Sequence, residues 1–157
     1  MDYWKTYRKL KYARQLVRGS RESGYEQLLA YLYMLRRETS GTFTRLKVDE
    51  EKRFKYLFLA FGTIILGFLY MRKVIGVDDT FLQGKYLGAL LTATVQDGNF
   101  QLYPIAFAVV DTNNNQYWKW FFKQLSCLIQ DDESLAIISN RHQSIGKTIK
   151  TFYPKSS

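Results

Sequence analysis

Two apolar runs joined by a short polar turn constrain the fold of this chain more than any other feature. The runs are "YLGALLTATVQ" and "FQLYPIAFAVVD", and Asp97, Gly98 and Asn99 separate them. Runs rich in β-branched and aromatic residues on both sides of an Asp-Gly turn are typical of an antiparallel hairpin. A third apolar run, "KVIGVD", precedes them. The sequence therefore predicts a meander of three antiparallel strands.

A helix, a fourth strand and a last helix are predicted after this meander. In "QYWKWFFKQLSCLI" the apolar residues share one helical face, and Lys119, Lys123 and Gln124 lie off it. "LAIIS" is typical of a short strand and "QSIGKTIKTFY" of a helix. The first helix allows a right-handed crossover that returns the fourth strand parallel to an earlier one. If it lies beside the first strand, Asp78 and Asn140 are neighbours at one edge of a mixed α/β sheet with ribonuclease-H-like geometry.

The chain before this sheet is predicted to be mostly helical. Residues 2–18 show the apolar spacing of an amphipathic helix. Ser23 and Glu26 have the spacing of a capping box, and "EQLLAYLYMLRR" is expected to continue as a second helix. "FTRLKV" alternates like a short strand, and Asp49 is a candidate cap for a third helix through "EEKRFKYLFLAF".

One apolar stretch raises the question of a membrane span. The run from Tyr56 to Met71 contains sixteen residues without a charge. A helix that crosses a bilayer usually needs about 20 apolar residues. Gly62 and Gly67 also divide the run, so a buried helix followed by a turn and a strand is the preferred interpretation. We therefore expect no membrane association.

The composition favours an intracellular domain with an anionic partner. The chain has 157 residues, of which 46% are hydrophobic, and its net charge is +9. A basic balance of this size favours nucleic acid or an acidic membrane face. Cys127 is the single cysteine and His142 the single histidine, which excludes a disulfide framework or a Cys/His zinc site within one chain. Cys127 is expected to be a small buried residue of the apolar helix.

Adjacent carboxylates at Asp78 and Asp79 suggest either a surface turn or a metal site. Neighbouring carboxylates repel each other unless a cation or water screens them. Acids at the ends of adjacent strands can hold one or two Mg²⁺ ions for phosphodiester cleavage. The alternation of a strand places Asp79 on the face opposite Asp78. The acids of the "DDES" loop are expected to be solvated rather than catalytic.

The whole C-terminal half resembles a known family of DNA-transposing enzymes. The similar segments are "VIGVDDTFLQGKYLGALLTATVQDGNFQLYPIAFAVVDTNNNQYWKWFFKQL" and "IISNRHQSIGKTIKTFYP". They resemble the core of the plant Mutator-like (MULE, MuDR-type) transposases, a DDE family. The stretches "RFKYLFLAFG" and "GFLYMRKVI" resemble the segment before that core, so the likeness covers about residues 25 to 155. It implies a partial RNase-H-like transposase domain over residues 73–157, preceded by a helical region over 1–72.

The resemblance assigns roles to individual residues. Asp78 matches the first metal-binding Asp, Asp79 stands where the family usually has Gly, and Asn140 stands at the second metal-binding Asp. The third acid, a Glu, belongs to a region after Pro154 and is expected to be missing. Mg²⁺ or Mn²⁺ is the family's cofactor. Four residues at or beside these positions are candidate supporting residues: Asp79, Thr80, Arg141 and His142.

These assignments predict a transposase-derived nuclear protein that binds DNA without sequence preference but does not cut it. An amide ligates Mg²⁺ without adding charge, so a site with one remaining carboxylate is expected to be inactive. A homo-oligomer or a complex with another transposase chain is also expected, because the truncated sheet has an open edge. Three alternatives stay open: a domesticated DNA-binding or regulatory protein, a small membrane-associated protein, and a non-functional remnant of the element.

Overall fold

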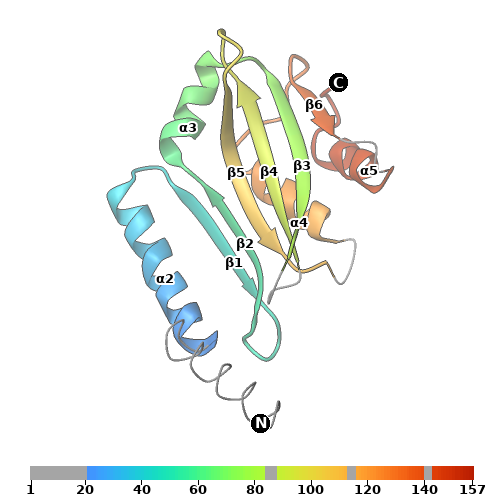
Figure 1. The fold of residues 1–157 in the computed structure, drawn as a ribbon. Coiled ribbons are helices and arrows are strands. Elements are labelled where there is room, and N and C mark those ends of the chain that lie inside the picture. The colour runs from blue at the N-terminus through green and yellow to red at the C-terminus, as the bar shows by residue number, and fades with distance from the viewer. Residues whose placement is uncertain (1–20, 84–87, 113–115, 140–142) are drawn as a thin grey trace, which may run out of the picture. The chain divides into compact units, whose positions relative to one another are not determined.

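The computed structural model describes residues 21–83, 88–112, 116–139 and 143–157 (Figure 1). These form two compact units that divide between Arg37 and Glu38. The described part of the first unit belongs to helix α2, Arg21–Glu38, whose last residue lies just past the division. This helix confirms the predicted second helix. Because α2 already begins at Arg21, Ser23 lies inside the helix and is not the N-cap that the sequence predicted. The predicted helix over residues 2–18 lies outside the described residues.

The second unit is built on a mixed sheet of six strands, where the sequence predicted four in its α/β core. The strands, in chain order, are β1 (Phe43–Val48), β2 (Phe54–Ala60), β3 (Val74–Leu82), β4 (Gly88–Gln96), β5 (Leu102–Val110) and β6 (Ala136–Ser139). Their order across the sheet is β1-β2-β5-β4-β3-β6. Every neighbouring pair is antiparallel except β3 and β6, which are parallel. The predicted meander and the parallel fourth strand beside β3 are thus confirmed.

β1 is the short strand predicted from "FTRLKV", whereas β2 arises where the sequence predicted a helix after Asp49. From Tyr56 onward every second residue of "FKYLFLA" is buried, as expected for a strand with one face on a core. One Asp49 carboxylate oxygen accepts hydrogen bonds from the backbone N–H groups of Glu51 and Arg53, and Lys52 adopts a φ of 59°. Asp49 therefore organises the β1–β2 turn and caps no helix. β2 then pairs with β5, so the hairpin extends the meander.

The uncharged run from Tyr56 to Met71 is divided among three elements. It contains most of β2, the short helix α3 (Gly62–Gly67) and the 3₁₀ turn η1 (Phe68–Tyr70). The predicted order of helix and then strand is therefore reversed here. Within the described residues, no helix is long and apolar enough to cross a membrane.

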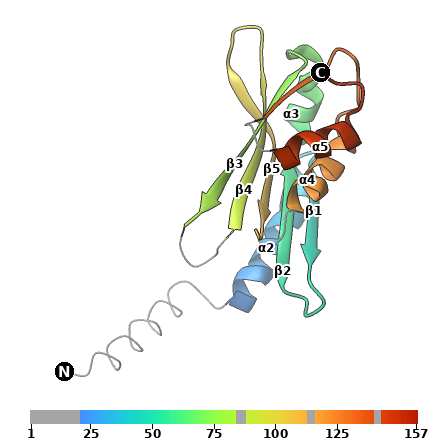
Figure 2. The ribbon, with the colours of Figure 1, turned by 90° about the vertical axis from the view of Figure 1, so that its right-hand side faces the viewer.

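Three helices pack with the sheet around one apolar core: α3 and the two helices that follow the meander. Figure 2 shows α4 (Tyr117–Ser126) and α5 (Gln143–Phe152) on the same side of the sheet. Phe121 is fully buried and contacts the rings of Phe58, Trp118 and Phe122, at centroid distances of 5.6 to 5.8 Å. The apolar face predicted for α4 is confirmed. Two expectations for this segment are wrong, because Gln124 is buried and Cys127, just after the helix, is exposed.

The C-terminal segment is anchored to the core by a buried tyrosine. The Tyr153 hydroxyl donates a hydrogen bond of 3.1 Å to the backbone oxygen of Ile129, and its ring lies against Phe122. Ser157 then exchanges two backbone hydrogen bonds with Leu135 and Ile137, as a residue of a parallel strand would. Ser157 thus occupies part of the outer edge of β6, which the sequence left open.

Replacing Tyr153 with phenylalanine is expected to weaken this anchor and to change its pH dependence. Burial raises the pKa of the Tyr153 phenol, and the Asp131 carboxylate raises it further. Stability that the neutral phenol contributes is present below the unfolded pKa of about 10 and is lost as the pH rises above it. We expect Tyr153→Phe to lower the free energy of unfolding by about 1 kcal/mol at neutral pH.

Urea unfolding of the parent and of Tyr153→Phe, at neutral pH and above the ordinary tyrosine pKa, checks this expectation. The parent should lose more stability than the variant on going to the higher pH. Equal losses in the two proteins would contradict the assignment of the alkaline effect to Tyr153.

Candidate functional site

Asp78 lies on β3, one residue beyond the last pair that links β3 to β6. That pair joins Val77 and Ser139. Because the two strands are parallel, their C-terminal ends lie at the same edge of the sheet. The Asp78 side chain is exposed, and its partner on the antiparallel side is Thr92 of β4. The structure therefore places the first predicted site residue in an accessible position next to the end of β6.

Asp79 belongs to the other face of the sheet. It is half-buried and lies opposite the fully buried Leu91, on the side covered by α4. Burial raises the pKa of the Tyr117 phenol at the start of α4, and the negative charge of Asp79 raises it further. The carboxylates of Asp78 and Asp79 therefore face different surroundings. They do not form a pair that could share one cation.

The remaining predicted residues divide between the described and undescribed parts of the chain. Thr80 is exposed and lies on the same face as Asp78, since residues two apart on a strand share a face. Asn140, Arg141 and His142 lie outside the described residues. In the sequence, Asn140 follows directly on Ser139, the last residue of β6.

The donors that the structure describes do not make up a magnesium site. Within residues 21–83, 88–112, 116–139 and 143–157, no group of three or more His, Cys, Asp or Glu side chains could hold a metal ion. Loop acids serve local turns instead: Asp97 accepts from the backbone N–H groups of Asn99 and Gln101. Two hydrogen bonds from Ser134 lower the pKa of Asp132. Asp78 is thus the one described carboxylate that fits the predicted site.

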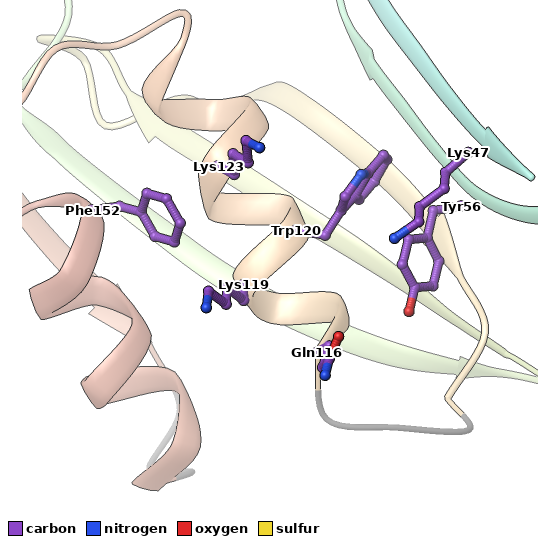
Figure 3. Close-up of a pocket in the computed structure, with 7 residues that line it drawn as sticks. All are labelled: Lys47, Tyr56, Gln116, Lys119, Trp120, Lys123 and Phe152. Carbon is purple, nitrogen blue, oxygen red and sulfur yellow. The ribbon is translucent and has the colours of Figure 1, made fainter.

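A separate basic pocket of about 210 Å³ lies beside α4 (Figure 3). Its walls come from β1, β2, α4 and α5, and its lining consists of Lys47, Tyr56, Gln116, Lys119, Trp120, Lys123 and Phe152. Three of these seven side chains are lysines and none is acidic. The Trp120 ring packs on Tyr56 at 5.1 Å and on Phe58 at 6.4 Å between centroids. Such a pocket can hold an anion next to a flat apolar group.

Sequence reasoning missed this pocket although part of its signal was present. Gln116, Lys119, Trp120 and Lys123 are spaced at i, i+3, i+4 and i+7, which places them along one stripe of α4. In the sequence of α4 alone, such a stripe is typical of an ordinary solvent-exposed helix face. Lys47 joins it because β1 and β2 were added to the sheet beside β5, and the sequence predicted a helix in place of β2.

Comparison with known proteins identifies the C-terminal part of the chain. The family model described as the MULE transposase domain matches residues 74–157, from the first residue of β3 to the end of the chain. No curated protein matches the chain. The match includes Asp78 and Asn140, whereas β1, β2 and Lys47 precede it. Since the matched region makes up more than half of the 157 residues, the chain belongs to the MULE transposase family.

Proposed function

We propose that this protein is a transposase-derived protein of the MuDR type that holds DNA in the nucleus without cutting it. The observation that carries the proposal is Asn140, an amide directly after β6 where the family resemblance expects the second metal-binding Asp. The β5-β4-β3-β6 order, with β6 parallel to β3, supports an RNase-H-like core. In such a core, Asp78 is the residue that would take the role of the first catalytic carboxylate.

The charge of the site argues against cleavage. Mg²⁺ is a hard cation that gives up its water reluctantly and depends on carboxylates when it binds proteins. Asn140 offers a carbonyl oxygen but no charge, and Asp79 lies on the other face of the sheet. Loss of one member from a catalytic set that acts as a unit commonly removes most of its activity. We therefore infer that strand cleavage and transfer, the chemistry of intact relatives, is lost here.

The net charge supports retention of DNA. A protein with charge +9 attracts the phosphate backbone through a term that does not depend on base sequence. The same charge fits a role in which the protein covers DNA or joins a second copy or another transposase chain on it. A domesticated DNA-binding or regulatory protein of this kind needs the fold but not the metal.

A plasmid-nicking assay tests the loss of cleavage. The purified chain is expected to nick supercoiled DNA no faster than Asp78→Ala, in Mg²⁺ or in Mn²⁺, because Asn140 adds no negative charge beside Asp78. Metal-dependent nicking by the parent that disappears in Asp78→Ala would overturn the proposal.

Thermal melts of the parent and Asn140→Asp provide the control for this assay. The midpoint of the parent is expected to stay constant when Mg²⁺ or Mn²⁺ is added. Asn140→Asp restores the second charge, so its midpoint should rise with metal, and Asp78→Ala in the same background should abolish the rise. A parent midpoint that rises with metal through Asp78 would contradict the inferred loss of the site.

A further inference from the structure

We propose that the basic pocket beside α4 is a binding site for single-stranded DNA. Lys47, Lys119 and Lys123 would hold phosphates, while Trp120 and Phe152 would offer apolar surfaces to an unpaired base. This inference rests on the proposed DNA binding and gives it a location. Lys47 lies before residue 74, where the family match begins, so the match does not cover the whole pocket.

The charges of the pocket lack internal compensation. Lys119 and Lys123 lie four residues apart on α4, where like charges repel each other. In the part of the chain that the structure describes, none of the three lysines forms an ion pair. The Lys47 ammonium lies over the ring of Tyr56, at 5.4 Å from its centroid. A bound phosphate would supply the anion that this arrangement lacks.

The aromatic residues favour a single strand over a duplex. Trp120 and Phe152 are both half-buried, so neither residue is fully withdrawn from solvent. Figure 3 shows the two rings on opposite sides of α4 with Lys119 and Lys123 between them. Sites for single-stranded nucleic acid combine aromatic surfaces with a basic groove that follows the backbone. A duplex keeps its bases stacked inside, so it would contact the lysines through its phosphates but would not contact the aromatic rings through its bases.

The pocket is separate from the remnant of the cleavage site. Its helix, α4, packs on the side of the sheet to which Asp79 belongs, and Asp78 belongs to the opposite side. A strand held at the pocket would therefore not lie across Asp78. Binding at this place can persist although the cleavage chemistry is lost.

Fluorescence anisotropy with a labelled single-stranded thymidine oligonucleotide and the full chain tests the proposal. We expect Lys119→Gln/Lys123→Gln to weaken binding on the order of tenfold at low salt. Two lost phosphate contacts, at about 0.7 each for single strands, should flatten the plot of log affinity against log salt by about 1.4. Phe152→Leu should weaken single-strand binding with little change in that slope, because it removes an aromatic surface but no charge.

The matched control is Lys147→Gln/Lys150→Gln on α5. It removes the same formal charge from two exposed lysines outside the pocket lining and should have a much smaller effect. Cooperative thermal melts establish that each variant is folded. Equal losses of affinity in the two double variants would contradict DNA binding at the pocket. The more general proposal that the protein binds DNA would still stand. If the parent binds neither single-stranded nor duplex DNA at low salt, the proposed DNA-holding function fails as well.

Discussion

Replacing Gly62 with alanine is expected to destabilise the sheet domain by about 3 kcal/mol or more. Gly62 is buried at the start of α3, and an added Cβ would lie 2.1 Å from the Ser40 backbone oxygen and 2.5 Å from the Gly41 carbonyl carbon. Both clashing atoms are backbone, so no rotamer change relieves them. Gly41 itself has a φ of +77°, and the Gly62 N–H donates to the Thr42 hydroxyl. Urea unfolding of the variant measures the loss.

The matched control is the same substitution at Gly146. This glycine lies inside α5, and an added Cβ would meet nothing within 4 Å. Alanine is better than glycine in a helix interior by about 1 kcal/mol, so Gly146→Ala should be neutral or stabilising. If Gly62→Ala unfolds at the same urea concentration as the parent, the backbone of Gly62 does not lie as close to Ser40 and Gly41 as described.

Truncating Phe121 to alanine is expected to cost about 3–5 kcal/mol of unfolding free energy. The residue is fully buried between α4 and the sheet, where its ring meets those of Phe58, Trp118 and Phe122. Removing it leaves a cavity that these stiff rings cannot close by small rotations. Since domains of this size are stable by about 5–15 kcal/mol, a large share of the total would disappear. Thermal and urea unfolding both report this loss.

Leu69→Ala serves as the comparison for Phe121→Ala. Leu69 is 73% exposed in η1, so its truncation should change the unfolding free energy by about 0.5 kcal/mol or less. A small cost at Phe121, close to that at Leu69, would mean that α4 does not pack on the sheet as described.

The core of the sheet could be predicted because its signals are local. Asp97 and Gly98 mark a turn between two runs of strand-forming residues, and the crossover rule places β6 parallel to an earlier strand. The structure confirms both, with β4 paired to β5 and β6 paired to β3. Each prediction used residues within one element or a general rule of chain connection.

The prediction at Asp49 failed because two structures share one sequence signal. In a helix N-cap and in an Asx turn, the Asp side chain accepts a hydrogen bond from a backbone N–H a few residues ahead. The run "YLFLAFGTIILGFLYM" after it has no polar spacing, so its period cannot distinguish a helix from a strand buried in a sheet. Residues 54–60 form a strand because β2 pairs with the edge of β5 that β4 leaves open.

By itself, the sequence determined the meander and the parallel β6, because turn chemistry and strand period act over neighbouring residues. The family also followed from the sequence, through the match over residues 74–157. Only the tertiary structure decided that β1 and β2 extend the sheet and that Lys47 meets Lys119 and Lys123 in one pocket. The physical reason is that side chains some 70 residues apart come together through strand pairing and helix packing. No local pattern in β1 or in α4 predicts that their lysines lie in the same pocket.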